Sequence, residues 1–409
     1  MTAFNPDDNP ILFRLRRRWF IFTACCFAAL AAGFIWLQVS WQPEYALRWL
    51  GQAVLVVTYL LWTLWRALPE NHRSEEAIQL PTFGAGTTLT LIRGVLIACL
   101  AGFLFSPWPD GWLAWLPGLV YTLAALMDYF DGFLARVTNH ATRMGEILDL
   151  SLDGVGMLTA AFLAVQYGQV PAWYLVVALA RYLYLAGLWL WDRLGKRAYP
   201  LQPSVRRRAF AGLQMGFLFV MLWPVFSPPG THLAAALFAL PFLAGFILDG
   251  LTASGILHQP GRRTGIWNAA ARWLPVLLRL CAAALMIGPL SRRFLEAGEQ
   301  AANFAAPSAI APQTWILILG VLEAVVSILL LLGAAGRTAS IFGLSLLGVS
   351  QIFTPLTPVQ ISLAVIYTMI LYLGSGALSL WTPEDRLIYR RAGERRAPSQ
   401  NDRLLQGKV

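Results

Sequence analysis

The sequence contains little charge. Asp, Glu, Lys and Arg make up 13% of its 409 residues, whereas hydrophobic residues make up 57%. A soluble domain is closer to one quarter charged. The shortage excludes an ordinary cytosolic enzyme, a disordered chain and a nucleic-acid-binding protein with a broad charged face. Cysteine is also scarce, and all four cysteines lie in apolar runs, so the sequence indicates neither a disulfide framework nor a thiolate zinc site.

Long apolar runs are what the chain has in abundance. A transmembrane helix needs roughly 20 mostly apolar residues. The first run is too long, and too closely followed by a second, to be a cleaved signal peptide. We therefore expect an all-α integral membrane protein with about twelve transmembrane helices. The expected runs lie near 19–39, 46–66, 88–106, 112–133, 145–167, 172–191, 209–227, 233–253, 273–290, 313–333, 338–354 and 357–380.

The basic residues predict the orientation of these helices. With the N-terminus in the cytoplasm, 25 of the 31 Lys and Arg residues fall in inner segments, three at outer ends and three inside spans. This asymmetry follows the positive-inside rule and requires an even number of spans. We expect a protein of the cytoplasmic (inner) membrane with both termini on the cytoplasmic side.

Two polar linkers predict the domain organisation. NHRSEEAIQLPTFGAG, which begins at Asn71, is typical of a boundary, and 254–272 forms a second linker. We expect a two-helix segment over 1–80, a six-helix core over 81–253, a four-helix bundle over 273–380 and a charged cytoplasmic tail over 381–409.

Four aspartates lie close together where carboxylates are costly, because an acid in a bilayer must be paired, hydrated or bound to a metal. Asp128 and Asp131 are three residues apart and share one helix face. Asp149 and Asp153 are four residues apart and share a face of the next helix. A short polar turn makes the two helices antiparallel neighbours, so both pairs are expected to face each other near the cytoplasmic end.

Divalent cations resolve the mutual repulsion of four carboxylates. Mg²⁺ and Mn²⁺ prefer hard oxygen ligands and are often shared with substrate phosphates. Gly132 lets a bulky ligand approach the backbone, and Ala135, one turn on, is also small. Arg136 can neutralise a phosphate or hold a carboxylate. Gly145 begins the second helix and permits a close helix approach.

The spacing of these residues, D-x2-D-G-x2-A-R-x8-G-x3-D-x3-D from Asp128 to Asp153, resembles the signature of the CDP-alcohol phosphatidyltransferase family. The resemblance extends along 85–253. TLTLIRGVL, with Arg93, is similar to the first core helix of the family, ALARYLYLAG, with Arg181, to the fourth, and PSVRRRAFAGLQM to the basic entry of the fifth. Six core helices is also the number in the family.

The resemblance implies a reaction in which an alcohol attacks the β-phosphate of a CDP-linked lipid, CDP-diacylglycerol, and releases CMP. It also implies two bound Mg²⁺ or Mn²⁺ ions and a homodimer in the lipid bilayer. Asp153 matches the general base of the family. The implied metal ligands are Asp128, Asp131, Asp149 and Asp153, and the implied nucleotide-binding residues are Gly132, Ala135, Arg136, Thr142 and Gly145.

The alcohol acceptor is assigned less directly. Arg181 lies at membrane depth, where it needs a counter-charge. Arg206, Arg207 and Arg208 enter the next helix. Together these arginines predict an anionic acceptor such as glycerol 3-phosphate or inositol phosphate, although the arginine run also fits positive-inside anchoring.

The last four helices carry few charges. Arg279 and Glu323 are the exceptions, and intramembrane ions usually pair with each other. VLEAVVSILLLLGAAGRTAS and LYLGSGALSL resemble the DoxX-like four-helix membrane family. The pair predicts either a small-molecule or redox-linked site or, more simply, a structural ion pair in an assembly module.

Two other functions compete with phosphatidyl transfer. In a transporter or channel, the aspartates would form a cation pathway, but continuous spans argue against broken-helix transport sites. In a redox or assembly module, the transferase region would be degenerate, which the intact set of aspartates opposes.

Overall fold

The structure, a computed structural model, describes residues 10–73, 78–196, 199, 205–256, 265–302, 311–351 and 355–384. The tail 385–409 and residues 257–264 of the second expected linker lie outside this range. The described chain is helical, without a strand. Its elements are α1 (Pro10–Ser40), α2 (Pro43–Ala67), η2 (Leu68–Glu70), α3 (Ala85–Ala101), η3 (Gly111–Trp115), α4 (Leu116–Val137), α5 (Arg143–Gln166), η4 (Ala172–Tyr174), α6 (Leu175–Arg193), α7 (Val205–Met221), α8 (Gly230–Ala253), α9 (Gly265–Leu295), α10 (Ala297–Ala302), α11 (Pro312–Leu332), α12 (Gly336–Ser350) and α13 (Pro358–Leu373).

Each of the twelve expected apolar runs overlaps one α-helix, which confirms the all-α fold class. The count of twelve spans is not confirmed, because eight helices of the described chain are long and apolar enough to cross a membrane. Helices α3, α7, α12 and α13 have 17, 17, 15 and 16 residues. At 1.5 Å per residue such helices are about 25 Å long, which is less than the hydrocarbon thickness of a bilayer. Gly374, with φ +88°, ends α13 earlier than the apolar run predicts.

Apolar side chains cover much of the outer surface of the helices. Val39 on α1 and Ile287 on α9, for example, are 87% and 68% exposed. In water such a surface would be unfavourable, whereas in lipid it is the expected one.

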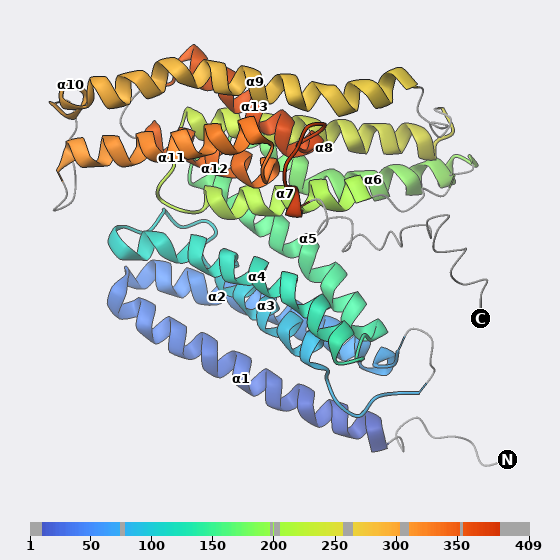
Figure 1. Cartoon of the computed structure of the whole chain (residues 1–409). Coiled ribbons are helices and arrows are strands. Elements are labelled where there is room, and N and C mark those ends of the chain that lie inside the picture. Colours follow the sequence, from blue (N-terminus) through green and yellow to red (C-terminus); the bar gives the residue numbers. More distant parts are fainter. Residues whose placement is uncertain are drawn as a thin grey trace. The chain divides into compact units, whose positions relative to one another are not determined.

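The chain divides into two compact units. The first contains residues 1–179 and 215–224, and the second contains 180–214 and 225–409. These bounds differ from those of the expected domains, which stay predictions. Helices α1 and α2 belong to the same unit as α3, α4 and α5 (Figure 1).

In the first unit, α3 is the central helix and contacts α2, α4 and α5. Trp49 on α2 contacts both α1 and α3. Its indole N–H donates to the carbonyl oxygen of Cys99 on α3 at 2.9 Å. The ring packs against Gly33 on α1, where a Cβ would lie 2.9 Å from the indole. Glycine at this position therefore lets α1 approach α2 closely.

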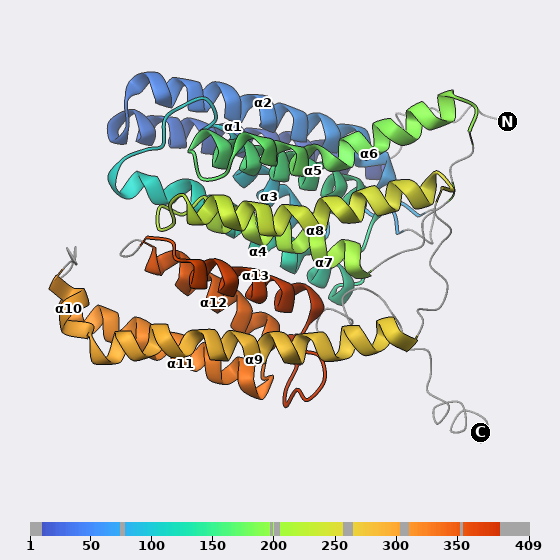
Figure 2. The same ribbon diagram turned by 90° about the horizontal axis from the view of Figure 1, so that it is seen from above.

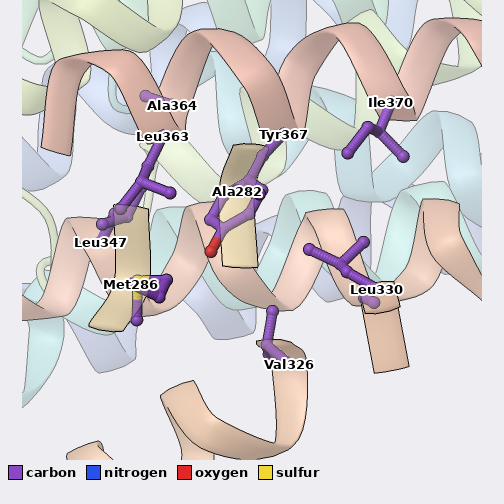
Figure 3. Close-up of a cluster of buried hydrophobic side chains, with 10 residues drawn as sticks. Ala282, Met286, Val326, Leu330, Leu347, Leu363, Ala364, Tyr367 and Ile370 are labelled. Carbon is purple, nitrogen blue, oxygen red and sulfur yellow. The ribbon is translucent and has the colours of Figure 1, made fainter. Parts of the chain in front are cut away.

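In the second unit, α9, α11, α12 and α13 form a four-helix bundle. Helix α9 contacts α11 and α13, and α12 contacts the same two helices; α9 and α11 lie side by side in both views (Figures 1 and 2). Each helix contributes to one buried apolar cluster (Figure 3). The cluster includes Met286 of α9, Leu330 of α11, Leu347 of α12 and Tyr367 of α13. A four-helix C-terminal bundle, as expected, is present between Gly265 and Leu373, whereas the bounds 273–380 and the resemblance to the DoxX-like family stay predictions.

Candidate active site in the first unit

The four aspartates gather around one arginine. Arg93 on α3 is 2% exposed, and its guanidinium forms an ion pair with Asp128 of α4. Its Nη1 lies 3.8 Å from Asp131 Oδ2. Its Nη2 lies 2.7 Å from Asp149 Oδ1 and 3.3 Å from Asp153 Oδ1, both on α5. Helices α3, α4 and α5 thus bring together one positive and four negative groups, and negative charge remains in excess.

Three of the carboxylates have the arrangement of a metal site. Ligand oxygens of Asp128, Asp131 and Asp149 all lie within 4.8 Å of one another. The Asp131 side chain is 9% exposed, whereas those of Asp128, Asp149 and Asp153 are 31%, 46% and 38% exposed. The cluster is therefore buried at Asp131 and open on the α5 side, so that an ion or a soluble ligand can reach it.

Small and hydroxyl residues on α3 allow this closeness. Thr90 Oγ1 donates to Asp131 Oδ2 at 2.9 Å and orients that carboxylate. A Cβ on Gly86 would lie 2.7 Å from the carbonyl oxygen of Asp131 and 2.8 Å from Cβ of Ala135. On α5, a Cβ on Gly145 would lie 3.3 Å from Thr87 Oγ1. Glycines therefore set the distances between α3 and the two helices that carry the acids.

We expect the Gly86→Ala variant to lower the free energy of unfolding by about 1–3 kcal/mol, because the added methyl group meets main-chain atoms of α4 that cannot rotate away. Unfolding of the purified variant in detergent measures this. Gly51→Ala on α2 is the control, since a Cβ there meets nothing within 4 Å. Equal effects of the two substitutions would contradict this account of the close α3–α4 contact.

The turn between α4 and α5 is held by the chain that precedes α3. Arg143 N–H donates to the His72 carbonyl at 3.0 Å, and Arg73 Nε donates to the Asn139 carbonyl at 3.1 Å. His140 Nε2 donates to the Thr82 carbonyl at 3.1 Å. The linker that was expected to mark a boundary therefore fixes the turn between the two acid-bearing helices.

Comparison with known proteins agrees with this geometry. The family model for CDP-alcohol phosphatidyltransferase matches residues 83–247. A CDP-diacylglycerol–glycerol-3-phosphate 3-phosphatidyltransferase from Pectobacterium atrosepticum is 32% identical over 146 residues, which are 34% of this chain and 78% of that protein. The chain belongs to the CDP-alcohol phosphatidyltransferase family. With the eight candidate spans, membership makes it an integral membrane protein.

Other relatives with the same printed name match over less of their length. The protein from Salmonella choleraesuis is 34% identical over 121 residues, or 28% of this chain and 64% of that protein. The one from Blochmanniella floridana is 34% identical over 92 residues, which are 22% of this chain and 46% of that protein. The chain thus spans less than two thirds of these two relatives. No solved structure gave a significant match. Helices α1, α2 and α9 to α13 lie outside the family match.

The structure gives the other signature positions of the family distinct local roles. Arg136 folds back toward Gly132, where a Cβ would lie 3.3 Å from its Nη1. Ala135 faces Gly86 of α3. Thr142 is 3% exposed and is the N-cap of α5, accepting a hydrogen bond from Gly145 N at 3.1 Å. Of the five expected nucleotide-binding residues, Arg136 is exposed and Thr142 is buried, whereas the other three are half-buried. The nucleotide role of all five stays a prediction.

The arginines predicted to bind the acceptor belong to the second unit. Arg181 is half-buried on α6, and Arg208 is exposed on α7. Arg207 Nη1 lies 3.6 Å from Asp249 Oδ2 on α8. The side chain of Arg206 lies outside the described part of the chain. The role of these four residues in acceptor binding stays a prediction.

The predicted pairing of Arg279 with Glu323 is wrong. Glu323 on α11 forms a bidentate pair with Arg293 of α9, with distances of 2.7 Å from Nε and 2.9 Å from Nη2. Arg279 is 2% exposed and instead donates from Nη2 to the carbonyl of Ala377 at 2.8 Å. Arg279 and Arg293 lie fourteen residues apart on the same helix, α9, so hydropathy did not show which of them pairs with Glu323.

We expect a double-mutant cycle to identify the partner of Glu323. Glu323→Gln and Arg293→Gln should show a coupling energy of at least about 1 kcal/mol, since they remove the same buried ion pair. The changes in unfolding free energy caused by Glu323→Gln and Arg279→Gln should be additive within about 0.5 kcal/mol. Reversible unfolding in mixed detergent micelles measures both cycles, and stronger coupling to Arg279 would restore the original prediction.

Sequence reasoning missed the role of Arg93. It noted that an intramembrane arginine needs a counter-charge and applied this to Arg181 and Arg279. The same rule applied to Arg93 would have pointed to the acids, which are the largest nearby group of opposite charge. Thr90, one helical turn before Arg93, carried no signal of its own.

Proposed function

We propose that this chain transfers a phosphatidyl group from CDP-diacylglycerol to an alcohol and releases CMP, as a step in phospholipid synthesis. The observation that carries the proposal is the group of Asp128, Asp131 and Asp149, whose oxygens lie within 4.8 Å of one another on the family signature. The names of the relatives support CDP-diacylglycerol as the donor and glycerol 3-phosphate as the first acceptor to test.

The residues fit a divalent metal. The donor set consists of carboxylate oxygens, which Mg²⁺ and Mn²⁺ prefer, and Arg93 brings one positive charge to the four acids that it contacts. Asp128, Asp131 and Asp149 would hold the metal, with Asp153 beside them. Bound there, the metal supplies charge neutralisation for the pyrophosphate and the departing CMP.

The protein itself supplies a base and a scaffold. Asp153 accepts the proton of the acceptor hydroxyl, and the alcohol oxygen forms a new bond to the β-phosphorus of the donor. The bond between that phosphorus and the oxygen bridging to the CMP phosphate breaks, and CMP leaves with the electron pair. Arg93 holds Asp149 and Asp153 on one guanidinium nitrogen, and this orients the base relative to the other acids.

The basic residues support a location in the cytoplasmic membrane with both termini inside, where the soluble product CMP is released. A homodimer, which the family resemblance implies, is part of the same proposal. Cross-linking of the protein in its native membrane tests it.

The test is release of CMP from CDP-diacylglycerol by the purified full-length chain. The acceptors are glycerol 3-phosphate, inositol, inositol phosphate and serine, each with Mg²⁺ and with chelator. Asp153→Asn is the test variant. Asp110→Asn is its matched control, because Asp110 is exposed in the loop before η3 and lies outside the acid cluster.

We expect metal-dependent release with one acceptor, lost in Asp153→Asn and retained in Asp110→Asn. A general base contributes about a hundredfold to ten-thousandfold in rate, which sets the size of the loss. Failure of the metal-loaded protein to bind CDP-diacylglycerol would overturn the proposal.

A further inference from the structure

A groove of about 720 Å³ lies between α1 and α3, outside the acid cluster. Arg14, Arg17 and Arg18 line it at the start of α1, followed by Ile21 and Phe22. Leu91 and Ile92 of α3 and the segment 81–83 form the opposite wall. The volume is within the usual range for ligand pockets.

One face of α1 changes from cationic to apolar along this groove. Positions 14, 17, 18, 21, 22 and 25 follow helical spacing, so their side chains share a face. Arg14, Arg17 and Arg18 are exposed, and no described residue forms a hydrogen bond or ion pair with their guanidinium groups. Among the described residues that line the groove, none is acidic. Within the described part of the chain, the groove therefore presents three positive charges without an acidic partner next to an apolar floor.

We propose that this groove binds an anionic phospholipid, with its phosphate headgroup on Arg14, Arg17 and Arg18 and an acyl chain along Ile21, Phe22 and Ile92. Charge complementarity selects the headgroup, because arginines bind phosphate through several parallel N–H donors. The apolar wall that continues from the arginines selects a lipid over a free anion. The inference does not depend on the proposed reaction.

This site is separate from the acid cluster. Thr88, Leu91 and Ile92 line the groove, whereas Thr90 and Arg93 bind the acids from the opposite face of α3. The wall at Thr82 is joined to the α4–α5 turn by His140. A lipid in the groove would therefore pack against the helix and the linker that position the acids.

Cys25 provides a probe inside the groove. Its thiol is exposed and lines the cavity, and Cys281 on α9 is exposed elsewhere in the same chain. We would measure maleimide modification of both cysteines by peptide mass spectrometry, on delipidated full-length protein in detergent. The additions are phosphatidylglycerol, phosphatidylcholine or inorganic phosphate.

Phosphatidylglycerol at ten times its Kd should slow modification of Cys25 about tenfold, because only lipid-free protein reacts, and should leave Cys281 unchanged. Phosphatidylcholine and phosphate should protect neither. The Arg14→Gln/Arg17→Gln/Arg18→Gln variant should raise the Kd by on the order of a hundredfold. The charge-matched control, Arg66→Gln/Arg193→Gln/Lys196→Gln, removes three exposed basic residues that do not line the groove and should keep the protection.

Three results would overturn the proposal. Equal protection by phosphatidylcholine would show a nonspecific apolar contact, and protection by phosphate alone would show a free-anion site. Protection that survives the triple arginine substitution would show that the headgroup binds elsewhere.

Discussion

Replacing Asp131 by Asn is expected to lower metal-dependent CMP release by at least about a thousandfold, because a metal ligand that stabilises the leaving group is worth several kcal/mol and each 1.36 kcal/mol is tenfold in rate. Asp131 is the most buried of the four acids and is oriented by Thr90. Asparagine has the same shape and can still accept the Thr90 hydrogen bond. The substitution therefore removes charge while keeping the packing of α3 against α4.

The measurement is initial-rate CMP release over a Mg²⁺ titration, with Asp110→Asn as the control. The variant should need more Mg²⁺ for its residual activity, whereas the control should behave as the unaltered chain. If Asp131→Asn kept more than a tenth of the rate at the same Mg²⁺ concentration, the metal would not be bound by the Asp128, Asp131 and Asp149 group.

Replacing Arg93 by Met is expected to lower the free energy of unfolding by about 3 kcal/mol in chelator, since it leaves several carboxylates without their buried counter-charge. The expected loss of stability is no larger, because three of the acids are more than 30% exposed and retain solvation. Mg²⁺ should restore part of this loss, because a divalent ion and the guanidinium neutralise the same acids.

Unfolding in detergent with chelator and with Mg²⁺ tests this. Arg136→Met is the control: Arg136 is exposed on α4 and pairs with none of the four acids, so the change should stay within about 0.5 kcal/mol. A stability of Arg93→Met that is insensitive to Mg²⁺ would mean that the metal does not bind at the acids that this arginine contacts.

The sequence predicted the residues that lie along single helices better than those that meet across helices. Spacings of three and four residues placed Asp128 with Asp131 and Asp149 with Asp153, and the turn between them made the two pairs neighbours. That part of the site follows from helix periodicity alone.

The partners of buried charges were harder to predict, because they depend on helix packing. Helix α9 carries four arginines, and only the packing of α11 against α9 selects Arg293 as the partner of Glu323. Arg93 lies on α3, 35 residues before Asp128, and reaches the acids because Gly86 lets α4 approach. Hydropathy likewise located the helices, and the count of about twelve spans stays a prediction, because eight helices of the described chain meet the length and composition of a span.

Two hydrogen bonds join the segment before α3 to the α4–α5 turn: the His72 carbonyl accepts from Arg143 N–H, and Arg73 Nε donates to the Asn139 carbonyl. They bear on how this chain can be recombined with its relatives. The family match begins at residue 83, which makes that point attractive for a chimaera. A crossover there would separate the turn from the main chain that holds it. Exchanges that keep 71–84 with α3, α4 and α5 would preserve the support of the acids, so the segment to exchange as a unit begins before the region that the family model matches.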